Sequence, residues 1–381
     1  MFGKIFSGLV CAFIPSREMR ESVRRSIRNR LFERYRVPNK FSKNVLITLW
    51  YASGFHGGVV YAAELSKILQ SLGYNVNIAC VILNKRIFGL FKESGANLYY
   101  ADEIPLDVEY DVVWAFNFPI LPFLIFHGLK YKKIIFNSLS GFLEIDVPVF
   151  FYKDINRVLV LSELHKKGFG VKYGIRQDIM TVFPNIILDE YYKKQKEPGH
   201  LRNIAVVSNH LVPEVKKALK LLRKRGYKTV IYGAKHNYVH ITPEILLKED
   251  VVITIGKTVQ YCLALGIPIY NYDHFGGVGY ITPSNVEEMA DNFSGSPTTD
   301  LPHKSAECIA DEIIDGFEEA KKHLGELKKF AQKYNGQKNV VDILDVVNND
   351  GKYPDIKVTA KNRLFFNYCN FIIKEVFRGK R

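Results

Sequence analysis

The chain has 381 residues, more than a single hydrophobic core of about 250 to 300 residues usually accommodates, so we expect two domains. Apolar residues make up 47% and charged residues 24% of the sequence, which excludes a disordered or fibrous protein. The net charge of +14 lies mainly at the two ends, because residues 1–36 and residues 357–381 each carry a net +6 and only +2 remains for the rest.

Both basic ends also contain apolar residues, a combination typical of segments that lie on anionic lipid. Basic tails without apolar partners would favour nucleic acid instead, which we do not expect as a partner. We therefore predict that residues 1–36 and 351–381 are basic amphipathic segments that bind a membrane surface. The alternative is a pair of ordinary terminal helices docked on the body.

The cysteines and the apolar runs indicate where the protein works. Five cysteines lie far apart with no CxxC pair, which fits reduced thiols rather than disulfides or a zinc site. No run reaches the roughly 18 to 20 apolar residues that cross a bilayer. We expect a cytoplasmic protein, peripheral on the inner face of the plasma membrane.

The residues from 44 to 83 read as a strand, a helix and a second strand. NVLITLW (44–50) and NVNIACVIL (75–83) are apolar runs of strand length, and residues 58–74 between them have one apolar helical face. Further strands are predicted at 97–102, 111–118, 132–139, 157–162 and 180–187. This alternation predicts a parallel, doubly wound sheet in a first domain of residues 37–187.

The alternation restarts after the polar stretch 189–203, which has the composition of a linker. The expected strands are 202–210, 228–234, 250–256 and 267–272, and the expected helices include 213–227 and 257–265. Residues 305–347 read as helices. We assign residues 188–350 to a second domain, so the predicted fold class is α/β with two Rossmann-like domains facing each other across a cleft.

Three strands of the second domain end in polar or small residues, where open α/β sheets bind ligands. These tips are Ser208-Asn209-His210, Gly256-Lys257-Thr258 and Asp273 to Gly277. Val251 occupies the place of the first Walker glycine, which argues against a P-loop. Gly256 instead ends a strand before a helix whose N-terminus favours an anion, and Lys257 adds a charge there while contributing little packing.

The first domain has a matching tip. Gly54, His56, Gly57 and Gly58 follow the first strand and precede a helix, so backbone N–H groups again point toward a ligand. The two sets of tips predict one phosphorylated ligand held between the domains.

Four motifs resemble the GT-B glycosyltransferases of bacterial capsule and surface-polysaccharide assembly, over about residues 44–347. These are GFHGG (54–58), VSNH (207–210), GKTVQYCLALGIPIY (256–270) and YDHFGGVGYI (272–281). The resemblance implies that Gly57, Gly58, Ser208, Asn209, His210, Gly256, Thr258, Asp273, Gly276 and Gly277 bind a nucleotide-sugar donor. It implies no metal or other cofactor, and Lys257 at the leaving phosphate.

One departure from that family concerns its acidic residues. Retaining members usually carry a Glu five residues before the glycine that ends this helix and another Glu eight residues earlier, and here those positions are Tyr261 and Ile253. Charge neutralisation would then fall to Lys257. His56 and His274 are the candidate bases for an acceptor hydroxyl.

Other chemistries are less well supported. His236 and His240 have helical spacing but no Cys, Asp or Glu nearby to complete a zinc site, so we expect no metal. GGVGYI lacks the following helix of a dinucleotide fingerprint. We predict a metal-independent transferase that passes a sugar to a lipid-linked or glycan acceptor, and the alternative is a non-catalytic protein that binds anionic lipid or nucleic acid through its ends.

Overall fold

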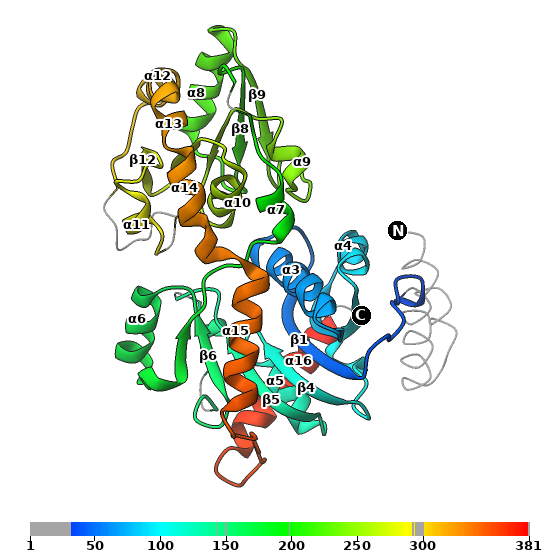
Figure 1. Cartoon of the computed structure of the whole chain (residues 1–381). Coiled ribbons are helices and arrows are strands. Elements are labelled where there is room, and N and C mark those ends of the chain that lie inside the picture. The colour runs from blue at the N-terminus through cyan, green and yellow to red at the C-terminus, as the bar shows by residue number, and fades with distance from the viewer. Residues whose placement is uncertain are drawn as a thin grey trace.

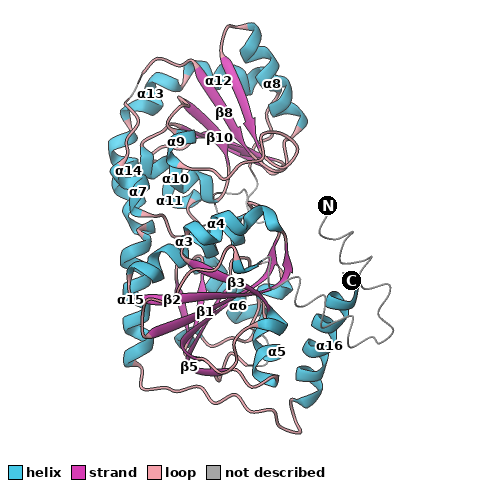
Figure 2. Ribbon diagram, turned by 90° about the vertical axis from the view of Figure 1, so that its right-hand side faces the viewer, coloured by secondary structure: helices cyan, strands magenta, loops and turns pink. Residues whose placement is uncertain are grey.

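The protein folds into two α/β domains, one above the other in Figure 1. The computed structural model describes residues 32–141, 143–148, 151–197, 199–291, 293 and 301–379. Each domain has a central sheet with helices on both faces (Figure 2), so the predicted fold class is confirmed. Within the described ranges, no helix is both long and apolar enough to cross a membrane.

The first sheet has seven parallel strands in the order β3-β2-β1-β4-β5-β6-β7. Its strands are β1 (Lys43–Ala52), β2 (Tyr74–Leu83), β3 (Ala96–Tyr100), β4 (Glu109–Ala115), β5 (Lys130–Asn137), β6 (Arg157–Val160) and β7 (Met180–Val182). Its helices are α3 (Gly57–Ser71), α4 (Phe88–Glu93), α5 (Ile120–Phe126) and α6 (Glu163–Tyr173). All seven expected strands are present, and each starts or ends within a few residues of its predicted range.

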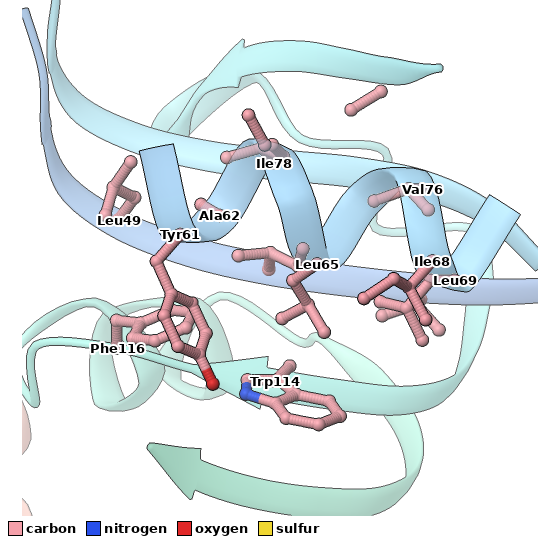
Figure 3. Close-up of a cluster of buried hydrophobic side chains, with 14 of the residues drawn as sticks. Leu49, Tyr61, Ala62, Leu65, Ile68, Leu69, Val76, Ile78, Trp114 and Phe116 are labelled. Carbon is pink, nitrogen blue, oxygen red and sulfur yellow. The ribbon is translucent and has the colours of Figure 1, made fainter. Parts of the chain in front are cut away.

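Side chains alternate across this sheet and build a core on each face. Val45 and Leu49 of β1 face α3, whereas Leu46 and Trp50 face α5. Figure 3 shows the first core, in which Leu65 lies among the strand residues beneath α3. Both faces are covered, which is why apolar residues stand at successive positions in the buried parts of β1, β4 and β5.

The second sheet has five strands in the order β12-β11-β10-β8-β9, and only β12 is antiparallel to its neighbour. Its strands are β8 (Asn203–Val207), β9 (Lys228–Tyr232), β10 (Val251–Thr254), β11 (Ile269–Asp273) and β12 (Gly276–Tyr280). Its helices are α7 (Asp189–Lys193), α8 (Pro213–Lys224), α9 (Pro243–Leu246), α10 (Lys257–Leu265), α11 (Val286–Met289), α12 (Ala306–Asp315), α13 (Phe317–Lys322) and α14 (Leu324–Ala331). Short 3-10 turns lie at Lys85–Ile87, Ala101–Glu103, Glu144–Asp146, Gln177–Ile179 and Gln332–Tyr334.

The chain returns to the first domain after α14. Helix α15 (Gly336–Asn349) packs Val340 and Leu344 into the core beneath α3. Helix α16 (Arg363–Gly379) then packs against α5 on the opposite face. The sequence-based boundary at residue 350 places α15 in the second domain, but its apolar face lies on the first sheet, because a helix packs where its apolar face is buried rather than with its neighbours in sequence.

Only the last residues of the predicted segment 1–36 are described, and they pack on the first domain. Phe32 is buried and stacks on Phe88 with 5.1 Å between ring centroids. The Arg36 guanidinium lies 3.7 Å from the Tyr99 ring centroid and donates to the Leu98 carbonyl. The expectation that residues 1–31 bind a membrane lies outside the described residues.

Candidate active site

A cavity of about 250 Å³ lies where the carboxyl ends of the two sheets approach each other. Phe55, His56, Gly57 and Val60 line it from the first domain. The second domain contributes the tips of β8, β9, β10 and β11. The predicted convergence of strand ends from both domains is therefore present as one shared cavity.

Eight of the predicted site residues line this cavity and five do not. Those that line it are His56, Gly57, Ser208, Asn209, His210, Lys257, Thr258 and Asp273. Gly58, Gly256, His274, Gly276 and Gly277 are not part of its lining.

Helix α10 begins at the cavity because Gly256 turns the chain sharply. Gly256 has φ 60° and ψ −136°, a conformation open to glycine but strained for other residues. Its own N–H donates to the Phe293 carbonyl at 2.9 Å. Lys257 and Thr258 are the first two residues of the helix, so their N–H groups have no carbonyl partner within it. These N–H groups and the helix dipole make the start of α10 a favourable place for an anion.

The Lys257 side chain joins the two domains. Its ammonium forms an ion pair with Glu64 of α3 and donates to the Ile186 carbonyl at 3.0 Å. The exposed fractions of the two paired side chains are only 12% and 4%. Burial lowers the pKa of Lys257 and raises the pKa of Glu64, while the attraction between the two charges opposes both shifts. Lys257 thus reaches the cavity wall, but its charge is already matched by a carboxylate.

Glu64 has a second partner on α10. The Tyr261 hydroxyl donates to Glu64, and the Tyr261 ring stacks on Tyr191 with 4.3 Å between centroids. Glu64 of the first domain therefore contacts two residues of α10, Lys257 and Tyr261, across the domain boundary. Sequence reasoning missed Glu64, whose only local signal is an acidic residue among the buried positions of α3.

A second contact between the domains closes one side of the cavity. The Phe55 N–H donates to the Tyr238 hydroxyl at 2.6 Å, and the Phe55 ring stacks near His240 with 5.8 Å between centroids. A Cβ at Gly54 would lie 2.1 Å from the Tyr238 hydroxyl oxygen, so this contact depends on glycine. None of Phe55, Tyr238 and His240 was predicted as a site residue, because aromatic residues in loops give no pattern.

The tips of β8 and β9 hold each other in place. The Ser208 hydroxyl accepts the His210 N–H at 3.0 Å, and the Asn209 side chain accepts the Ala234 N–H at 3.0 Å. A Cβ at Gly233 would lie 1.9 Å from the Ser208 carbonyl oxygen, so the two tips touch backbone to backbone. The cavity wall on this side is therefore preformed.

The two candidate bases lie in different surroundings. Burial lowers the pKa of His56, so its imidazole is neutral at pH 7 and can accept a proton. His274 is half exposed, and its Nδ1 lies 3.0 Å from an Asp273 carboxylate oxygen. The same oxygen accepts a hydrogen bond from the backbone N–H of His274, so the Asp273 side chain fixes the turn after β11. His56 alone of the two faces the cavity.

The glycines of the predicted sugar loop form a hairpin. Gly276 and Gly277 open β12, which pairs with β11. A Cβ at Gly277 would lie 2.1 Å from the Asn271 carbonyl oxygen, and Gly276 has φ 82°. Close strand pairing accounts for both glycines. Among the described residues, no group of three or more His, Cys, Asp or Glu side chains could hold a metal ion.

His165 is a buried titratable group at the carboxyl edge of the first sheet. Its Nδ1 accepts the Leu161 N–H at 3.3 Å, so its Nε2 carries the proton and faces the Ser138 hydroxyl, also at 3.3 Å. Burial lowers its pKa from 6.5 to about 4.

The His165 shift predicts a loss of stability in acid. The unfolded chain binds this proton near pH 6.5 and the folded chain only near pH 4, so the stability that His165 provides is present above pH 6.5 and falls as the pH is lowered. The difference in unfolding free energy between the wild type and His165→Gln should shrink by about 3 kcal/mol from pH 7.5 to pH 4. Urea titrations at both pH values measure it, and a constant difference would contradict the prediction. Burial raises the pKa of Asp146 to about 6, so this residue makes the folded state more stable in acid. Its contribution is the same in the wild type and the variant and therefore cancels in the difference.

No protein-family model and no curated protein sequence matches this chain. Among solved structures, a glycosyltransferase from Rickettsia africae ESF-5 superposes with a TM-score of 0.53 and 16% identity, over 82% of this chain and 100% of that one. HepE of Anabaena, solved in complex with UDP, has a TM-score of 0.52 and 11% identity, over 80% and 99% of the chains. A Listeria monocytogenes protein assigned as a UDP-N-acetylglucosamine 2-epimerase has a TM-score of 0.52 and 11% identity, over 84% and 100%.

At these identities the likeness concerns the fold. It extends over about four fifths of this chain, which includes residues of both domains, and over almost the full length of the two neighbouring chains. The chain therefore has the GT-B fold, as the motifs in its sequence suggested.

Proposed function

We propose that this protein is a glycosyltransferase that moves a sugar from a nucleotide-sugar donor to a growing surface glycan of the capsule or lipopolysaccharide type. The observation that carries the proposal is the N-terminus of α10, which opens into a cavity lined by both domains. A nucleoside diphosphate has the charge for that helix start, and the HepE structure, which contains UDP, has the same fold.

The proposed reaction places negative charge on the leaving diphosphate. The N–H groups of Lys257 and Thr258 already point to that position before the reaction, which is how a preorganised site stabilises a transition state. His56, neutral and in the cavity wall, would take the proton of the acceptor hydroxyl. In this scheme the helix dipole supplies the positive charge, and no metal ion is needed.

The acceptor side of the proposal is a lipid-linked or glycan chain at the cytoplasmic face of the plasma membrane. It is supported by the basic, apolar ends of the sequence. Nucleic acid is not proposed as a partner, since the charge between residues 36 and 357 is nearly balanced.

A thermal-shift panel of UDP, GDP, CMP and ADP tests the proposal. A nucleotide at 100 times its dissociation constant adds about 2.7 kcal/mol to the free energy of unfolding, so one member of the panel should raise the melting temperature. No response to any nucleotide would favour the non-catalytic alternative, a peripheral protein that binds through its basic ends.

The same fold in the Listeria protein makes sugar epimerisation the second candidate. The two activities differ in their products. A transferase releases the nucleoside diphosphate only as sugar appears on an acceptor, and an epimerase changes the sugar of the donor without any acceptor. Chromatography of the nucleotide sugars after incubation with and without a membrane extract separates these outcomes, and added EDTA should leave the transfer rate unchanged.

A further inference from the structure

Helix α16 has two apolar faces, and within the described part of the chain only one of them is covered. Phe366, Cys369, Ile373 and Phe377 are buried on the first domain, and the helix packs along α5. Phe366, Ile373 and Phe377 are among the apolar residues that make this end of the sequence look like a membrane segment. These three side chains are buried in the core of the first domain, so a membrane contact has to come from other residues.

The opposite face of α16 carries three large apolar side chains that are exposed. Leu364 is 82% exposed, Tyr368 56% and Phe371 60%. Their spacing of four and three residues sets them in one row along the helix. Such a row of apolar side chains on a helix surface marks an interaction site.

Basic residues surround this row. Lys361, Arg363 and Lys374 are exposed, and the one acidic residue of the helix, Glu375, is only partly exposed and already has an interaction partner. Lys and Arg beside exposed aromatic and aliphatic side chains match the interface of an anionic bilayer, where apolar groups enter and cations meet headgroups. Nucleic acid would not use the apolar row, and a stable protein partner would need about 20 to 30 residues a side.

We infer that the exposed face of α16, formed by Leu364, Tyr368 and Phe371 with Lys361, Arg363 and Lys374, docks on an anionic lipid surface. This deepens the proposed function, because it says which face of the first domain meets the membrane that holds the acceptor. Its test does not involve nucleotide, so the two proposals fail separately.

Tryptophan fluorescence reports the contact directly in the full-length chain. Trp50 and Trp114 are buried, so a lipid quencher does not reach them. The variant Tyr368→Trp is mixed with phosphatidylcholine vesicles that contain roughly 30% phosphatidylglycerol as the anionic lipid. Brominated phospholipids in these vesicles should quench the emission of the new tryptophan. The control is Val171→Trp on α6, at a position that is 82% exposed, and it should not be quenched. Equal quenching of both variants, or of neither, would overturn the inference.

Vesicle sedimentation measures the affinity. Changing Leu364, Tyr368 and Phe371 together to serine should weaken binding about a thousandfold, roughly tenfold for each apolar side chain that no longer enters the bilayer. Changing Lys361, Arg363 and Lys374 to glutamine should weaken it roughly fivefold per charge, and more so at low salt. Val171→Ser should bind like the wild type. Three results would contradict a lipid-docking face. The serine variant could bind anionic vesicles as tightly as the wild type, or the wild type could bind neutral vesicles equally well. The wild type could also form a dimer without lipid while the serine variant is a monomer.

Discussion

Replacing Lys257 with methionine is expected to destabilise the protein by about 3 to 5 kcal/mol, because it leaves the Glu64 carboxylate buried without its cation. Glu64 is 4% exposed, so water does not replace the lost partner. The sequence had suggested that Lys257 carries little packing, and its burial between the domains says otherwise. Urea titration followed by circular dichroism measures the loss.

The matched control is the double variant Glu64→Leu/Lys257→Met, which removes both charges. It should recover most of the lost stability, since an apolar pair of similar size replaces a buried ion pair at little cost. Tyr261→Phe removes only the hydroxyl that donates to Glu64 and should cost about 1 kcal/mol. If Lys257→Met is as stable as the wild type but binds nucleotide poorly, Lys257 acts on the phosphate and not as a link between domains.

Replacing Gly256 with valine should weaken nucleotide binding by roughly 100-fold or more. Valine resists φ 60° with ψ −136°, so the turn must change and the N–H groups of Lys257 and Thr258 move away from the cavity. Two hydrogen bonds to a charged phosphate, at about 1.5 to 3 kcal/mol each, account for a loss of this size. Calorimetric titration with the nucleotide found by the panel measures it.

Gly226→Val provides the control for strain alone. Gly226 has φ 94°, follows α8, and like Gly256 has open space around its missing Cβ. Both variants should lose about 1 to 3 kcal/mol of stability, and only Gly256→Val should lose nucleotide affinity. Similar affinity losses in both would mean that the helix start has no special part in binding.

The strands of both domains could be predicted because a parallel sheet covered on both faces selects continuous apolar runs. Residues 44–50 and 75–83 are of this kind, and they pair as β1 and β2. The tips could be predicted for a related reason. Parallel strands end at one edge, so Ser208 and Thr258 meet in one cavity although 49 residues, including strand β9, lie between them in the sequence.

The links between the domains could not be read from local patterns. Tyr261 and Glu64 lie 197 residues apart, and no local pattern in either helix indicates that they pair. The return of α15 to the first sheet likewise depends on which core has room for its apolar face. Gly276 and Gly277 were predicted to form a ligand-binding loop, but they lie in a strand that pairs closely with β11. Glycine occurs in both settings, because each requires another backbone or a ligand to approach closely.

The most direct test of the account is a crystal structure of the protein with the nucleoside diphosphate that stabilises it most. The account predicts that the diphosphate accepts hydrogen bonds from the backbone N–H groups of Lys257 and Thr258 within the cavity between the domains. A nucleotide bound elsewhere, or a diphosphate turned away from the start of α10, would contradict it.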